Sequence, residues 1–249
     1  MKLQIIAILL ATSIAESAPI VIPQSGPYTS DANTLILEHF DGTVTGTTQG
    51  TPSFATGYFS QGMQFNDTSR IYWSLGAQSQ GTMELWVKLD SNSNTEGSDI
   101  TNIAFSSMNL SFGPTGYIET YDGVTRGGTT RAGINAAPFN WNDFPDGPAL
   151  SLSAWHHLAV TWGSLGLRYY VDGDLVRSNA NTSGQNTATT VWGVGFAVTS
   201  GAGFNGVADE FRVSNVQRTF SPAPEPTTCG LLLLGSVLLC SRRRAFAAR

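Results

Sequence analysis

Short runs of alternating apolar and polar residues dominate this chain of 249 residues, and no long stretch shows helical apolar spacing. From Met83 to Leu89 every second residue is apolar, and Glu84, Trp86 and Lys88 lie between them. Because strand side chains alternate between two faces, this run predicts a strand with one core face and one polar face that carries a large aromatic ring. Similar strands are expected at 35–40, 62–65, 71–75, 100–105, 117–120, 155–162, 191–198 and 207–213.

A tight hairpin is predicted where Asp172-Gly173 separates the β-rich runs 167–171 and 174–177. Glycine tolerates the positive φ that such turns require. In the run 207–213, strict alternation predicts that Val207, Asp209, Phe211 and Val213 share the inward face. The stretch 135–147 is predicted to be a long loop, and the three prolines at 222, 224 and 226 predict a linker.

Composition agrees with a turn-rich β protein rather than a helical one. Glycine is abundant at 27 residues, and only 12% of the residues are charged. Both cysteines, Cys229 and Cys240, lie near the end of the chain, so no disulfide or thiol is available to the rest of it. A stretch of about 200 residues is long enough to form one hydrophobic core.

The two ends of the chain have the composition of export signals. Lys2, a short apolar run and small residues at Ala15 and Ser17 predict a secretory signal peptide over 1–17, cleaved after Ala15 or Ser17. The alternatives are a buried first strand and an N-terminal anchor. Near the other end, the apolar stretch 229–240 is too short for a comfortable membrane span and is followed by a basic end at 242–249.

The arrangement of Pro224-Glu225-Pro226, a short apolar segment, and Arg242, Arg243 and Arg244 resembles the PEP-CTERM class of exported bacterial proteins. The resemblance covers 222–249. It implies a Gram-negative cell envelope, cleavage near Pro-Glu-Pro by an exosortase, and delivery to the cell surface or extracellular polymer after transient inner-membrane contact. An ordinary C-terminal anchor is the alternative. The expected organisation is a signal peptide (1–17), an N-terminal linker (18–33), one domain (34–220) and a sorting tail (221–249).

Five segments, in order, resemble the laminin-G-like, concanavalin A-like jelly rolls. They are LILEHFDGT (35–43), GTMELWVKLD (81–90), WHHLAVTW (155–162), YYVDGDLV (169–176) and GVADEFRVS (206–214). The resemblance spans nearly the whole expected mature chain and implies a jelly roll, an all-β sandwich of two antiparallel sheets. It does not fix the function, because this fold carries lectins, glycan-binding modules, adhesion domains and glycanases.

Charge excludes nucleic acid as a partner. The chain has 13 Lys and Arg against 18 Asp and Glu, and removing the two ends takes away five of the basic residues but only two of the acidic ones. Binding of phosphate backbones or anionic lipid heads needs clustered Lys and Arg.

No catalytic residue is predicted. The chain has neither an E-x-D-x-x-E strand nor a Gly-x-Ser-x-Gly elbow, and it has only three histidines. His156 and His157 are neighbours on a predicted strand, so they face opposite sides and cannot bind one metal ion. His156 is expected to be a hydrogen-bonded core histidine.

Calcium is considered at Asp41, at the end of the first strand, and at Asp209, which faces inward on the last strand. In several domains of the resembled superfamily, the first and last strands lie close together. Hard cations prefer carboxylate and carbonyl oxygens. The alternative is that Asp41 caps a turn and Asp209 accepts hydrogen bonds from backbone or arginine.

Carbohydrate contact is considered at Trp141, Asn142 and Asp143, because aromatic rings stack on sugars and short polar side chains bond their hydroxyls. Trp86 is a weaker candidate. The alternative is that these aromatic rings are buried. The sequence thus predicts an exported, non-enzymatic protein that binds a polysaccharide; a structural matrix protein without ligand, and a hydrolase or lyase, are the other hypotheses.

Overall fold

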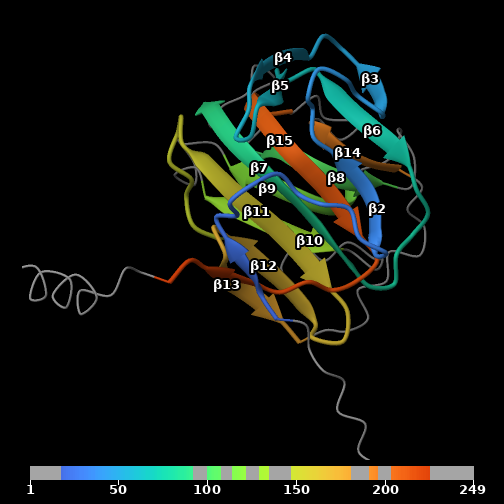
Figure 1. The fold of residues 1–249 in the computed structure, drawn as a ribbon, viewed down its shortest axis with the longest axis vertical. Helices are drawn as coiled ribbons and strands as arrows, with labels where there is room; N and C mark the ends of the chain where they lie inside the picture. The colour runs from blue at the N-terminus through green and yellow to red at the C-terminus, as the bar shows by residue number, and fades with distance from the viewer. Residues whose placement is uncertain are drawn as a thin grey trace, which may run out of the picture.

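The computed structural model describes residues 18–91, 100–107, 114–121, 129–134, 147–180, 191–195 and 203–224. Within these ranges the chain forms strands and turns and no helix, so it also contains no helix that could span a membrane. The strands run in the order shown in Figure 1. They are β1 (Ile20–Ile22), β2 (Thr34–Glu38), β3 (Thr47–Gln49), β4 (Ser53–Thr56), β5 (Gln61–Phe65), β6 (Arg70–Ser74), β7 (Gly81–Ser91), β8 (Ile100–Ser107), β9 (Pro114–Tyr121), β10 (Thr130–Ile134), β11 (Trp155–Trp162), β12 (Leu167–Val171), β13 (Asp174–Asn179), β14 (Val191–Gly195), β15 (Asn205–Ser214) and β16 (Phe220–Pro222).

Two antiparallel sheets pack face to face, which confirms the predicted sandwich. The six-stranded sheet has the order β10-β9-β8-β14-β6-β3. The eight-stranded sheet has the order β13-β12-β11-β7-β15-β5-β4, with β2 paired beside β15. The long strand β15 therefore pairs with β5 over its first half and with β2 over its second half.

The main core lies between the two sheets. Met83, Leu85, Val87 and Leu89 of β7 are all at most 1% exposed and belong to it, as their alternation predicts. The indole ring of Trp162 on β11 stacks on that of Trp192 on β14, with 5.7 Å between the ring centroids. Because β11 and β14 belong to different sheets, this pair ties the two layers together.

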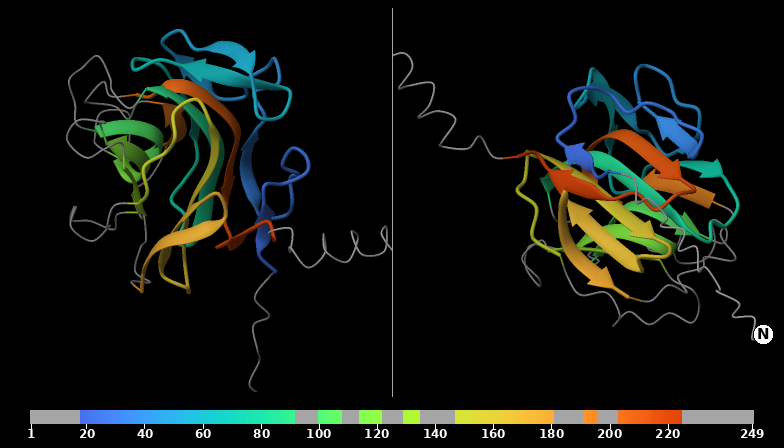
Figure 2. Two further views of the ribbon diagram at one scale, coloured as in Figure 1. Left: turned by 90° about the vertical axis from the view of Figure 1, so that its left-hand side faces the viewer. Right: turned by 60° about the horizontal axis from the view of Figure 1, so that its bottom comes forward.

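A third layer covers the other face of the eight-stranded sheet. Residues 18–33, here called the strap, run across that face, as the left view of Figure 2 shows. Strand β1 of the strap pairs in parallel with β16 near the opposite end of the described chain. The sequence predicts a linker over 18–33, whereas the structure makes the strap part of the folded unit, because its apolar residues find an unfilled sheet face.

The hairpin predicted at Asp172-Gly173 is present between β12 and β13, with φ of 52° at Asp172 and 88° at Gly173. The predicted alternation along β15 is wrong. A β-bulge between Asp209 and Arg212, with φ of 54° at Glu210, inserts an extra residue. Asp209 therefore pairs with Trp86 on the strap side, while Phe211 packs in the main core.

Candidate functional site: a pocket beneath the strap

The strap packs on an aromatic layer of the eight-stranded sheet. Ile22 and Tyr28 of the strap are 1% and 3% exposed and cluster with Trp86 and Phe220. The sequence predicts a polar face that carries Trp86, with burial of this ring as the alternative to carbohydrate contact. The strap covers this face, and Trp86 and the neighbouring Glu84 are buried.

A buried ionic network lies under the strap. Glu84 accepts a hydrogen bond from Arg212 Nε at 2.9 Å, and its other oxygen lies 3.1 Å from His157 Nε2. The guanidinium of Arg212 stacks over the ring of Tyr28, 4.3 Å from the ring centroid. Burial raises the pKa of Glu84, but the Arg212 charge and the His157 contact outweigh it, so this pKa lies below its usual value. Glu84 is thus held as a carboxylate that fixes Arg212.

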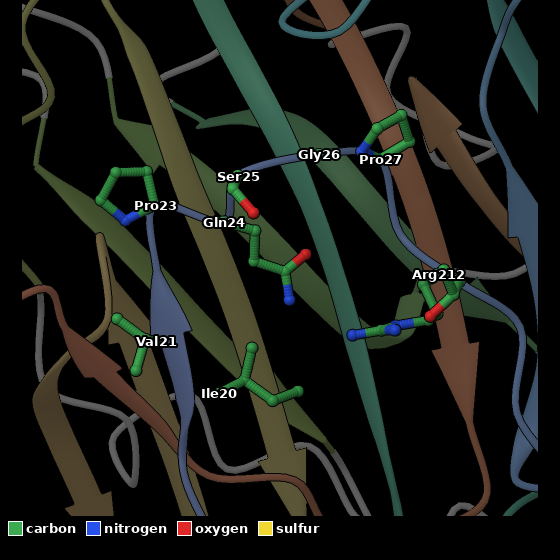
Figure 3. Close-up of a pocket in the computed structure, with 9 residues that line it drawn as sticks. Ile20, Val21, Pro23, Gln24, Ser25, Gly26, Pro27 and Arg212 are labelled. Atoms are coloured by element: carbon green, nitrogen blue, oxygen red, sulfur yellow. The ribbon is translucent and has the colours of Figure 1, made fainter.

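Arg212 also lines a pocket of about 540 Å³. Figure 3 shows its guanidinium reaching toward an arc of strap residues. Besides Arg212, the lining comes entirely from the strap: Ile20, Val21, Pro23, Gln24, Ser25, Gly26, Pro27 and Thr29. Arg212 is therefore the one charged residue of the lining.

The guanidinium of Arg212 is buried and ion-paired. Arg212 is 4% exposed, and its Nη2 atom lies 2.8 Å from Glu84 Oε1. Arg212 thus places a fixed positive charge at the wall of the pocket.

The aromatic candidate Trp86 offers no free ring face to a sugar. It is 3% exposed, and Tyr58 stacks on it with 3.7 Å between the centroids. Tyr58 in turn meets the half-buried Trp155 edge to face, and Lys88 lies over the Trp155 ring. Trp86 therefore supports a small, partly open aromatic group instead of contacting solvent itself.

The two calcium candidates meet around the turn between β4 and β5. Asp41 accepts a hydrogen bond from the backbone N–H of Gln61 at 3.0 Å, and Asp209 accepts one from that of Phe59 at 2.8 Å. Glu210, beside Asp209 in the bulge, accepts from His39. Within the described ranges, no three His, Cys, Asp or Glu side chains converge as a metal-ligand group.

The carboxyl of Asp209 is poorly compensated. Burial, and secondarily the neighbouring Glu210, raise the pKa of Asp209 to about 7 although backbone N–H groups bond to it. Burial likewise raises the pKa of Glu210 against the effect of His39. Two adjacent acids that resist ionisation suit a cation that would neutralise them.

The sequence analysis did not predict a group of three hydrogen-bonded side chains at the start of β11. His156 Nε2 lies 2.8 Å from Ser151 Oγ, and its Nδ1 lies 2.8 Å from Asp172 Oδ2. The expected hydrogen bonding of His156 is therefore present, at the rim of the sandwich, while His157 turns to the opposite face toward Glu84. No motif signals this grouping, because the three residues come from a loop, a strand and a turn.

Several predicted residues fall beyond the described ranges. Trp141, Asn142 and Asp143 are among them, as are the signal peptide and most of the sorting tail: Glu225, Pro226, Arg242, Arg243 and Arg244. Pro224 is described and exposed.

The two antiparallel sheets packed face to face place the chain in the class of all-β sandwich proteins. The family model of the concanavalin A-like lectin/glucanases superfamily matches residues 56–222, and the chain belongs to this family. No protein of the curated set matches the sequence.

Solved structures agree on the fold. Domain 4 of AbnA, an extracellular arabinanase of Geobacillus stearothermophilus solved with arabinotriose, is 18% identical with a TM-score of 0.55; the match covers 76% of this chain and 96% of that domain. Trypanosoma rangeli sialidase is 12% identical with a TM-score of 0.54, and the match covers 76% of this chain but 31% of the sialidase. At these identities the likeness concerns the fold alone.

Proposed function

We propose that this protein is a carbohydrate-binding module and that its sugar site is the pocket beneath the strap. The observation that carries the proposal is Arg212, which Glu84 holds in place and which is the one charged residue lining a pocket of about 540 Å³. Pockets of roughly 300–1,000 Å³ accommodate small ligands. A guanidinium presents a rigid set of donors that bonds hydroxyls and bonds carboxylates with two parallel hydrogen bonds.

The fold supports this proposal without deciding it. A domain of an arabinanase solved with arabinotriose shares the architecture. The strap adds polar groups at Gln24 and Ser25 beside the arginine, and both line the pocket. Hydroxyl-rich ligands are recognised by such small sets of convergent polar groups. A carboxylate-bearing sugar would also be attracted by the positive charge of Arg212.

The direct test fills the pocket without disturbing the network. A Cβ atom added at Gly26 meets no atom within 4 Å, so Gly26→Phe places a ring at the pocket without a backbone clash. Gly76→Phe is the matched control, because a Cβ there also meets no atom within 4 Å and Gly76 is not among the pocket residues. Binding of the full chain to arabinan and polygalacturonate is measured by affinity electrophoresis.

We expect Gly26→Phe to weaken binding at least about tenfold, a loss of roughly 1.4 kcal/mol, and Gly76→Phe to change it less than about twofold. Equal binding by the wild type and Gly26→Phe would place the site elsewhere. Loss on Trp141→Ala alone would assign it to the loop 135–147. No retention of any variant by either polymer would favour a structural protein without a specific ligand.

We further propose one structural calcium ion at Asp41 and Asp209. The two carboxylates bond the same turn, and Asp209 carries a charge that the surrounding protein does not balance. Calcium usually takes six to eight oxygens, so backbone carbonyls and waters would complete the shell. Calorimetric titration with calcium should show one site that Asp41→Asn and Asp209→Asn both weaken; heat of binding unchanged in both variants would exclude these ligands.

Export and sorting are proposed from the two ends of the sequence. We infer cleavage by signal peptidase near Ser17 and by an exosortase near Pro224-Glu225-Pro226, with delivery to the Gram-negative cell surface or its polymer. Mass spectrometry of the native protein from cells should find both ends removed; an intact chain of 249 residues would contradict the proposal.

A further inference from the structure

We propose that Ser151, His156 and Asp172 form a serine–histidine–aspartate site that hydrolyses short-chain carboxylic esters. The site lies at the rim of the sandwich, where the loop before β11 meets the turn between β12 and β13. It shares no residue with the pocket beneath the strap, so this activity is independent of the proposed carbohydrate binding.

The atoms are connected in the order that nucleophilic catalysis requires. Ser151 Oγ lies 2.8 Å from His156 Nε2, and Asp172 Oδ2 lies 2.8 Å from His156 Nδ1. Both distances fall within hydrogen-bond reach of a nucleophile and its base. Because Asp172 Oδ2 accepts a hydrogen bond from Nδ1–H, the neutral imidazole keeps Nε2 as the acceptor for the Ser151 hydroxyl.

The orienting carboxylate is itself held in place. Asp172 Oδ1 accepts a hydrogen bond from the backbone N–H of His157 at 2.8 Å, and the backbone N–H of Asp172 donates to the carbonyl of His157 at 2.8 Å. Asp172 therefore spans the hairpin turn and the first residues of β11. This is the third element that such sites need, a group that fixes the orientation of the base.

Exposure suits a reacting nucleophile. Ser151 is exposed, whereas the His156 side chain is 16% exposed, so the hydroxyl faces solvent above a shielded base. Leu152, directly beside the nucleophile, is 46% exposed and offers an apolar contact. We therefore assign the site to esters of small acyl groups, whose alcohol portion can stay in solvent.

The reaction balances with water as the co-reactant. Ser151 Oγ attacks the ester carbonyl carbon while its proton passes to His156 Nε2. The carbon–oxygen bond to the alcohol then breaks, and His156 returns the proton to the departing alcohol. Water, deprotonated by His156, attacks the acyl-serine, which releases the carboxylic acid and regenerates the serine.

The experiment combines covalent labelling with turnover of p-nitrophenyl acetate by the purified full chain. A fluorophosphonate probe should modify Ser151, as peptide mapping by mass spectrometry would show, and Ser151→Ala should lose both labelling and turnover. Ser178→Ala is the control, because Ser178 is an exposed serine on β13 outside the chain of hydrogen bonds. It should label and turn over as the wild type does.

Asp172→Asn separates catalysis from folding. Asparagine accepts the positive φ of this turn, and Asn-Gly is a favoured pair there. Its amide would donate to Nδ1, which moves the imidazole proton to Nε2 and removes the acceptor for Ser151. We expect turnover to fall at least about a hundredfold at an unchanged melting temperature. A folded wild type that neither labels at Ser151 nor exceeds the buffer rate overturns the proposal, as does wild-type turnover by Ser151→Ala.

Discussion

The buried acid Asp209 makes the sharpest prediction about stability. The perturbation is Asp209→Asn, which removes the charge and keeps the shape of the side chain. Both carboxylate oxygens accept backbone hydrogen bonds, from Phe59 and from Glu210. An amide and a protonated carboxyl each have one carbonyl oxygen as acceptor, so the variant should match the wild type at a pH where Asp209 is protonated.

The charge of Asp209 makes the difference between the two proteins depend on pH. Asp209 has a pKa of about 7 in the folded protein, whereas an unfolded aspartate has a pKa of about 3.9. Between these values the folded state binds more protons than the unfolded state, so stability falls as pH rises through this window. The full linkage from pH 5 to pH 8 is about 2.6 kcal/mol, which solvent screening reduces to roughly 2 kcal/mol.

Urea unfolding of the two proteins at about pH 5 and pH 8, without divalent ions, checks this reasoning. The variant should be about as stable as the wild type at the lower pH and more stable by roughly 2 kcal/mol at the higher pH. Millimolar calcium should stabilise the wild type at the higher pH and leave the variant unchanged. A difference between the two proteins that is the same at both pH values would refute the claim that the Asp209 charge is uncompensated.

Three further substitutions test other parts of the structure. Glu84→Ala should lower the free energy of unfolding by about 3–5 kcal/mol, because it strands the buried charge of Arg212; denaturant titration measures it, and a loss under about 1 kcal/mol would contradict a buried pair. Phe220→Ala should lower the free energy of unfolding by about 3 kcal/mol and speed proteolysis within the strap, because this ring is 6% exposed and packs in the layer beneath the strap. Cleavage at the wild-type rate would argue against the strap as a packed layer. Gly166→Ala should lower the free energy of unfolding by more than about 1 kcal/mol, because φ at this position is +75° and a Cβ would come within 2.2 Å of the Asn179 carbonyl oxygen. An unchanged melting temperature would count against this turn geometry.

Most strands of the two sheets were predictable from local pattern. The alternation in β7 and β11 fixes which side chains enter the main core, and Asp172-Gly173 fixes the hairpin, because both signals act between near neighbours. The short strands β1, β3, β4, β10 and β16 carry too few residues to show a period. The strap and β16 were predicted as linkers, because the burial of their apolar residues depends on the aromatic face that they cover and is not visible in the local pattern.

The site residues divide in the same way. Asp41 and Asp209 were paired from a resemblance, and the structure brings them to one turn, but the bulge at Glu210 that turns Asp209 toward the strap leaves no trace in the alternation. Arg212 was not singled out, since its role depends on Glu84 from another strand and on the strap that closes the pocket. Ser151, His156 and Asp172 were not grouped for the same reason.

The amino-acid sequence by itself determined the all-β class, the hairpin and the identity of the main core, because backbone geometry and side-chain alternation are local properties. Tertiary structure decided which polar groups meet: the arginine that lines the pocket, the acids around one turn, and the histidine between a serine and an aspartate. Hydrogen bonds and charges act over a few ångströms, so these relations exist only after residues distant in the chain have been brought together.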